Sequence, residues 1–211
     1  MRKIFFLISI VTLAFGACKT EKKEKIAAKE KVAIKEVTVP NNVDTTNSII
    51  TWKGTKPTGS HNGSVALKEG ALVTKDGMVK GGDFVIDLTT IKCLDIEDEK
   101  YNQKLVNHLK SADFFDVEKY PTVKFVIAST EIKNNKLQVT GNLTIKNITK
   151  SITIPATISE DNGITTFASD IFTINRADFN VKYGSKSFFD NLKDKFIDDL
   201  IELSFTVKTK K

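Results

Sequence analysis

Apolar and polar residues alternate with a period of two along several segments of this chain, and no other feature constrains its fold as strongly. In residues 136–146 every second position is apolar or glycine, and the residues between are Lys, Gln, Thr or Asn. Because successive side chains of a β-strand point to opposite faces, such a segment predicts a strand with one buried face and one face in water. Similar alternation occurs at residues 50–54, 84–88, 125–127, 152–158 and 201–207.

Turn-forming residues separate these segments. Asp-Gly at 76–77, Asn-Asn at 134–135 and Asp-Asn-Gly at 161–163 lie between alternating stretches, as in β-hairpins. About eight strands must then cover their apolar faces, and a closed barrel or a two-sheet sandwich would achieve this. Gly54 and Gly141 share the inward phase and would leave volume free, which favours a barrel; alternatively they mark bulges. We therefore predict an all-β domain, an antiparallel eight-stranded β-barrel.

Helical spacing is clear in one stretch. Tyr101, Leu105 and Leu109 recur at intervals of four, which predicts a short amphipathic helix at about residues 97–110. Residues 187–200 are a second candidate for a short helix. One or two short helices are therefore expected beside the strands.

The N-terminus has the order of a secretory signal. Arg2 and Lys3 precede an uncharged run over residues 4–17, shorter than the roughly 20 residues that a membrane-spanning helix needs. The small residues before Cys18 resemble a lipoprotein signal, in which this cysteine is acylated, although Phe15 stands where leucine is usual. We predict a signal peptide at 1–17 and lipidation of Cys18. The alternative is an ordinary signal peptide with an incidental cysteine.

Residues 18–40 are rich in Lys, Glu and Ala and contain no aromatic residue or glycine. Such a segment buries little apolar surface, so we expect a charged, flexible tether that joins the lipidated cysteine to a domain at 41–211. The leader and the tether hold most of the excess positive charge behind the net +6 of the chain. The domain itself is nearly neutral, and we expect no binding to nucleic acid.

Three segments together resemble the YceI-like family: residues 108–125, residues 141–155, and Asn-Arg-Ala-Asp-Phe at 175–179. The resemblance covers roughly residues 43–208. It implies a lipocalin-like barrel in a secreted or periplasmic protein, and a ligand that is a polyisoprenoid or another long-chain lipid.

The expected function is therefore the binding of a long-chain apolar ligand, polyisoprenoid-like or fatty-acid-like, inside the barrel of a lipid-anchored envelope protein. Phenylalanine dominates the aromatic residues, 14 against three Tyr and one Trp, and suits an aliphatic tail. The alternative is a filled barrel that acts as a protein-interaction module of the cell envelope, with no lipid ligand. The inward residues predicted to contact the ligand are Trp52, Phe84, Ile86, Phe125, Ile127, Leu143, Ile145, Ile154, Phe172, Ile174, Leu203 and Phe205.

His108 and Arg176 are the candidates for the polar end of the ligand. Arg176 is the one arginine outside the leader, which indicates a need for bidentate geometry; Asp178 or Asp113 is its expected partner, and a purely structural salt bridge is the alternative. His61 lies in a polar loop and is interpreted as solvated.

We expect no enzyme activity, because no nucleophile and base lie together in any known motif. Cys93 is interpreted as a small apolar residue near a strand end, without a disulfide if Cys18 is acylated. The acidic run over residues 95–99 lacks the glycine turn of a calcium loop and is assigned to a helix N-terminus. No metal and no cofactor are predicted. The expected partners are the apolar ligand and a bacterial membrane that holds Cys18, on its periplasmic or surface side, with a homodimer left open.

Overall fold

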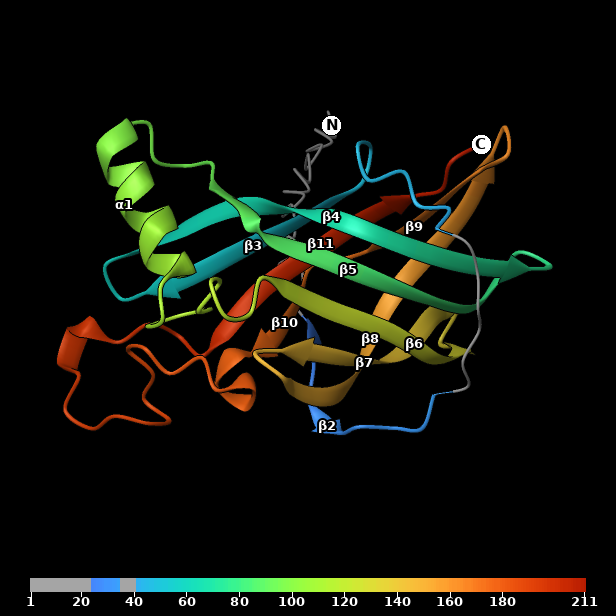
Figure 1. The fold of residues 1–211 in the computed structure, drawn as a ribbon. Coiled ribbons are helices and arrows are strands. Elements are labelled where there is room, and N and C mark those ends of the chain that lie inside the picture. Colours follow the sequence, from blue (N-terminus) through green and yellow to red (C-terminus); the bar gives the residue numbers. More distant parts are fainter. Residues whose placement is uncertain (1–23, 35–40) are drawn as a thin grey trace, which may run out of the picture.

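The computed structural model describes residues 24–34 and 41–211, which form an antiparallel β-barrel (Figure 1). Trp52 of the first barrel strand pairs with Leu203 of the last, and this pairing closes the sheet. The all-β, eight-stranded barrel predicted from the alternation is confirmed, and the two-sheet sandwich is excluded. In order around the barrel the strands are β3 (Ile49–Lys56), β4 (Gly59–Lys75), β5 (Met78–Cys93), β6 (Thr122–Lys133), β7 (Lys136–Ile145), β8 (Ile148–Asp161), β9 (Ile164–Ser169) and β11 (Leu200–Lys208).

The hairpin turns lie at the predicted positions. The turn residues Asp76, Asn134, Asn135 and Asn162 have φ between 50° and 59°, the left-handed region that tight hairpins require. Lys146 and Asn147, which were not predicted as a turn, also have positive φ and connect β7 to β8.

One α-helix, α1 (Glu99–Lys110), connects β5 to β6 and lies at one end of the barrel (Figure 1). Its N-cap is Asp98, whose carboxylate accepts the backbone N–H of Tyr101. The region expected as a second helix contains only the 3-10 turn η2 (Lys193–Lys195), because Asn191 and Lys193 adopt positive φ and interrupt any helix there. A second 3-10 turn, η1 (Arg176–Phe179), follows β10 (Phe172–Asn175).

The barrel wall is split where β9 ends. β9 pairs with β8 from Ala156 onward, whereas the next strand, β10, pairs with β11 instead. Residues 24–34 cross this split, and we call them the strap. Its strands are β1 (Glu24–Lys25), which runs parallel to β10, and β2 (Lys29–Glu30), which runs antiparallel to β8.

The strap differs from the solvated tether expected of its composition. Ile26 is buried, and its backbone N–H donates to the carbonyl of Thr173 over 2.9 Å. The side chain of Asn142 on β7 both accepts from the N–H and donates to the carbonyl of Val32, at 3.0 and 2.8 Å. These bonds use the edge of β10 and one side chain of β7, and Ile26 adds an apolar contact; composition alone does not reveal these partners. Cys18 and the expected signal peptide lie outside the described residues.

The two ends of the barrel interior are filled differently. The end away from α1 holds the β4–β5 and β6–β7 hairpins, and there the side chains of Val79 and Val139 have no exposed surface. At the α1 end the inward side chains surround open volume, so this end contains the candidate site.

Candidate functional site: an apolar cavity at one end of the barrel

The barrel encloses a cavity of about 690 Å³ that reaches the end covered by α1. Its walls are aliphatic and aromatic side chains from the inward faces of the strands. The cavity lies under Leu105 and Leu109 of α1 and under Phe114 and Phe115 of the turn that follows the helix. Its volume is within the roughly 300–1,000 Å³ of typical small-molecule sites.

All but two of the predicted ligand-contacting residues line this cavity. The lining members are Trp52, Phe84, Ile86, Phe125, Leu143, Ile145, Ile154, Ile174, Leu203, Phe205, His108 and Arg176.

Ile127 and Phe172 are buried but lie outside the cavity wall. Ile127 pairs with Gly141, next to an irregularity in the β6–β7 ladder that follows it. Phe172 lies where β10 meets the strap, with its ring 6.5 Å from that of Phe205. Alternation predicts that both residues point inward, but it does not predict which parts of the interior are filled.

Several lining residues were not among the predicted ligand contacts, and Phe167 on β9 is the most deeply buried aromatic residue of these. Its ring lies between those of Phe84 and Phe205, at 6.1 and 4.9 Å, and it is almost completely buried. The residues that share its face of the strand, Thr165 and Ser169, are polar, so β9 shows no apolar alternation. Other strand residues that line the cavity but were not among the predicted ligand contacts include Val65, Leu67, Leu88, Ile91, Val123, Ile152, Ile201 and Val207.

The two glycines assigned to the interior have opposite roles. At Gly54 a Cβ atom would meet nothing within 4 Å, and Gly54 lines the cavity. At Gly141 a Cβ atom would lie 2.5 Å from the ring of Phe125 and 2.7 Å from the carbonyl oxygen of Val126. Gly141 therefore makes room for a neighbouring ring and does not leave open space.

The mouth of the cavity is polar. Lys53 and Lys56 of β3 and Lys195 of the 182–199 loop lie among its lining residues, together with His61, His108 and Asp194. His108 contacts the carboxylate of Asp113 through Nε2 at 3.3 Å. The centroid of the Tyr183 ring lies 4.6 Å from that of the His108 ring. The mouth thus carries more basic than acidic groups.

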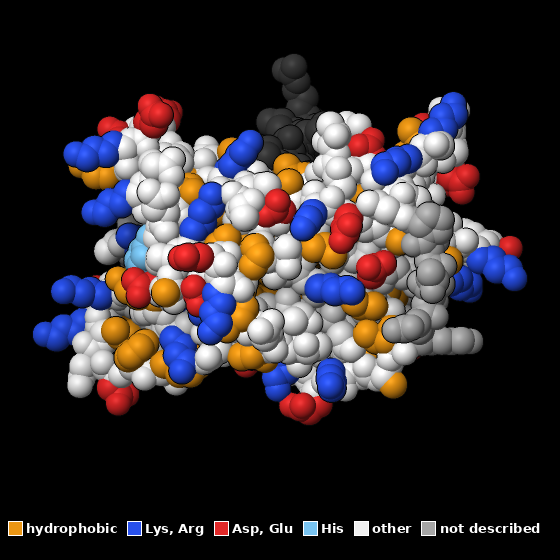
Figure 2. Space-filling view, viewed as in Figure 1, with side chains coloured by type: hydrophobic (Ala, Val, Ile, Leu, Met, Phe, Trp, Pro, Cys, Tyr) orange, Lys and Arg blue, Asp and Glu red, His pale blue; other side chains and the backbone are white. Residues whose placement is uncertain are grey.

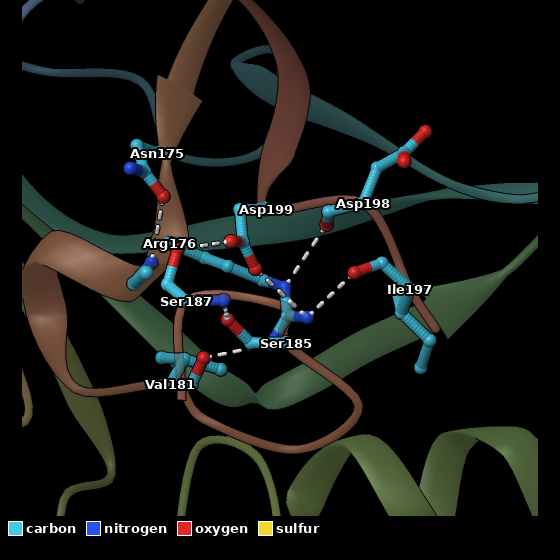
Figure 3. Close-up of polar contacts among 9 residues, drawn as sticks. Asn175, Arg176, Val181, Ser185, Ser187, Ile197, Asp198 and Asp199 are labelled. Carbon is cyan, nitrogen blue, oxygen red and sulfur yellow. Dashed lines mark hydrogen bonds and ion pairs between the residues drawn. The ribbon is translucent and has the colours of Figure 1, made fainter. Parts of the chain in front are cut away.

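Arg176 lies under the mouth and is 2% exposed. Its Nε, Nη1 and Nη2 donate to the carbonyls of Asp198, Val181 and Ile197 over 2.7–3.1 Å (Figure 3). Its ion-pair partner is Asp199 at 3.4 Å, whereas Asp113, one of the two expected partners, pairs with His108. Burial lowers the pKa of Arg176, and the carboxylates of Asp199 and Asp198 oppose this shift. Arg176 therefore ties the 182–199 loop to the barrel end.

A second polar cluster lies beside the mouth, where β4 meets the end of β5. Asp95 accepts from His61 Nδ1 at 2.9 Å, from the N–H of Asn62 at 2.8 Å and from the thiol of Cys93 at 3.3 Å. Burial raises the pKa of Asp95, but these three hydrogen bonds outweigh it and hold the pKa below its usual value. The pKa of the Cys93 thiol is raised, chiefly by burial. Register brings these residues together, since Gly63 pairs with Cys93.

On the face of the molecule shown in Figure 2, acidic and basic side chains are interspersed, and neither sign of charge forms a continuous patch. Among the described residues no helix is both long and apolar enough to cross a membrane.

An antiparallel eight-stranded barrel with an apolar interior and one polar mouth defines the lipocalin-like class of protein. The chain belongs to the YceI-like family, since the model of the YceI-like domain matches residues 41–209.

Curated relatives match over shorter stretches. A UPF0312 protein of Pseudomonas putida strain KT2440 is 38% identical over 81 residues, which cover 36% of this chain and 42% of that protein. Protein YceI of Salmonella newport is 41% identical over 49 residues, 23% of this chain and 26% of the relative. The chain thus aligns with less than half the length of these relatives.

Solved structures agree on the fold. BcnA of Burkholderia cenocepacia has a TM-score of 0.62 and 23% identity, over 80% of this chain and all of that one. A domain from Saccharophagus degradans, described as polyisoprenoid binding and implicated in plant cell wall breakdown, has a TM-score of 0.57 and 12% identity, over 82% and 99%. At these identities the likeness shows the fold alone.

Proposed function

We propose that this protein binds one elongated apolar molecule, a polyisoprenoid or a fatty-acyl chain, in the barrel cavity and carries out no chemistry on it. The observation that carries this proposal is the 690 Å³ cavity with its almost wholly apolar wall. Each methylene group that leaves water for such a site stabilises the complex by roughly 0.8 kcal/mol. The family membership and the description of the domain from Saccharophagus degradans support the same ligand class.

The polar mouth supports an orientation for the ligand. Lys53, Lys56 and Lys195 surround it, together with the two histidines. The tail would lie among the phenylalanine and isoleucine side chains, and an anionic or hydrogen-bonding head group would remain at the mouth. Arg176 would shape the mouth from below, because its nitrogens already donate to main-chain carbonyls.

Extraction of co-purifying lipid tests the proposal. Full-length protein and a Gly54→Trp variant would be purified in parallel, extracted with organic solvent, and the extracts compared by mass spectrometry. We expect a long-chain species at about one equivalent in the natural protein and much less in the variant, whose indole would occupy the mouth. Lipid that adheres to the surface would be equal in both. If neither protein carries or takes up an apolar probe, the protein-interaction alternative is favoured.

We also propose that acylation of Cys18 anchors the protein to an envelope membrane, on its periplasmic or surface side. The basic start, the uncharged run over residues 4–17 and the small residues before Cys18 support this. Metabolic labelling with an alkyne fatty acid should mark the full-length protein in the membrane fraction. A Cys18→Ala variant should lose the label, and its retention would contradict the assignment.

A further inference from the structure

Three side chains with metal-binding atoms converge beside the cavity mouth: His61 of β4, Cys93 at the end of β5, and Asp95 just beyond it. Their ligand atoms all lie within 4.8 Å of one another. A tetrahedral Zn²⁺ ion has ligand distances of about 2.0–2.3 Å to imidazole, thiolate and carboxylate, so one ion fits between three such atoms after small side-chain rotations. Among the described residues this is the one group of three or more such side chains close enough to share an ion.

The backbone around the three residues is already fixed. The N–H of Asn62 holds one oxygen of Asp95 at 2.8 Å, and the N–H of Leu94 donates to the carbonyl of Asn62 at 2.9 Å. The side-chain amide of Asn102 on α1 donates to the carbonyls of Cys93 and Ile96, at 3.0 and 2.9 Å. The contact from Asn62 is the kind that orients a ligating carboxylate, and the other three hydrogen bonds fix the main chain that carries Asn62, Cys93 and Ile96.

The existing contacts also suit a cation. Cys93 donates its thiol proton to Asp95, and His61 shares a proton with the same carboxylate. In each contact a proton lies between two groups that can both bind a metal ion. When the proton is released, the metal ion takes its place between them. The cluster is half-open, since the side chains of His61 and Asp95 are 35% and 26% exposed. An ion can therefore reach it from solvent without opening the barrel.

We propose that His61, Cys93 and Asp95 form a binding site for a borderline divalent metal ion, Zn²⁺, with water in the fourth position. The mixed sulfur, nitrogen and oxygen ligands favour zinc over calcium or magnesium, which require oxygen ligands alone. Because His61 also lines the apolar cavity, the ion would lie at the rim of that cavity. The site does not depend on which lipid, if any, the cavity holds.

Cobalt substitution tests the site, because Co²⁺ takes the place of Zn²⁺ and reports its ligands by absorption. The full-length protein, reduced and freed of metal, would be titrated with Co²⁺ and then with Zn²⁺ in competition. We expect one equivalent of Co²⁺ to bind with a thiolate-to-cobalt charge-transfer band and tetrahedral d–d bands, and Zn²⁺ to displace it.

Three variants assign the ligands. Cys93→Ser should abolish the charge-transfer band. His61→Asn and Asp95→Asn should each weaken Zn²⁺ binding by at least about tenfold, because the loss of a mere hydrogen bond to a ligand already weakens metal binding by that factor. Glu97→Gln is the matched control, since it removes a neighbouring acid outside the cluster and should leave binding unchanged. Thermal melting of each variant identifies any that fail to fold.

Two results would overturn the proposal. One is the absence of stoichiometric binding in the natural protein, which would leave a purely hydrogen-bonded structural cluster. The other is a charge-transfer band that survives in folded Cys93→Ser.

Discussion

At the scale of single residues, Gly54 and Gly141 show that a shared inward phase does not mean a shared role. Gly54 faces open cavity, so a series of Ala, Leu and Phe at this position should progressively reduce the binding of a fluorescent apolar probe. The melting temperature should not fall along the series, because a Cβ there meets no atom and glycine is itself unfavourable in a strand. Probe titration and thermal melting of each variant check both statements. Undiminished binding by Gly54→Phe would place the ligand elsewhere.

Gly141→Leu should make the barrel unfold more easily, although the alternation alone places Gly141 among positions that would leave volume free. The new side chain would have to displace the ring of Phe125 and the carbonyl of Val126. We expect a loss of about 1–3 kcal/mol in the free energy of unfolding, the usual effect of overpacking. Urea denaturation measures it, and an unchanged midpoint would contradict the packing described here.

Arg176→Lys should destabilise the protein although it keeps the charge. One ammonium cannot reach the three carbonyls that the guanidinium bonds, so buried acceptors would lose their donors. Each such loss costs about 1–3 kcal/mol. Chemical denaturation should show this, and hydrogen exchange should rise first in the 182–199 loop. Equal stability of the variant would mean that the loop is held by other contacts.

Residues of the cavity wall could be predicted from sequence to the extent that period-two alternation fixes their phase. That rule placed Phe84 and Leu203 correctly. It missed Phe167, whose neighbours on the same face are polar. The cluster of His61, Cys93 and Asp95 could not be predicted from the sequence, because it depends on the β4–β5 register, which pairs Gly63 with Cys93. Taken singly, each member looked like a loop, core or helix-end residue.

At the scale of elements, the strap is the main departure from the sequence-based picture. Its composition predicts solvation, since its few apolar residues bury little surface. The strap is held by pairing with the two strands that border the split in the barrel wall. The edges of β8 and β10 carry main-chain groups that require hydrogen-bond partners, and β2 and β1 supply them. The salt bridge between Lys150 and Glu30, at 2.7 Å, adds little because Glu30 is 90% exposed.

Asn142→Leu should release the strap while the barrel stays folded. The change removes both hydrogen bonds to Val32 and leaves the inward face of β7 untouched. We expect faster tryptic cleavage at Lys29 and Lys31 and faster hydrogen exchange at Ser151. Gln138→Leu, on the same outward face of β7, is the matched control and should change neither. If Asn142→Leu is cleaved no faster, main-chain pairing alone holds the strap.

At the scale of the whole molecule, the strap determines how far the barrel could stand from a membrane. If Cys18 is acylated, only residues 19–23 separate the anchor from β1, a span of at most about 20 Å. Release of the strap would extend the connection up to residue 41 and allow roughly 80 Å. The docked strap would therefore keep the barrel near the lipid surface, where the local concentration of an apolar ligand is highest.

A flexible spacer placed between residues 23 and 24 changes the distance of the barrel from the membrane without changing the affinity of the cavity for its ligand. With about 20 Gly and Ser residues inserted, the barrel and strap remain intact but the barrel moves freely above the bilayer. We expect slower uptake of a fluorescent lipid from the vesicles that carry the anchored full-length protein, because the effective concentration falls as the connection lengthens. Uptake of the same probe from solution should be unchanged. A spacer of charged, helix-forming residues of equal number tests whether length or flexibility matters. Equal uptake rates with and without the spacers would show that the strap serves the barrel wall alone, since distance from the membrane would then have no effect on loading.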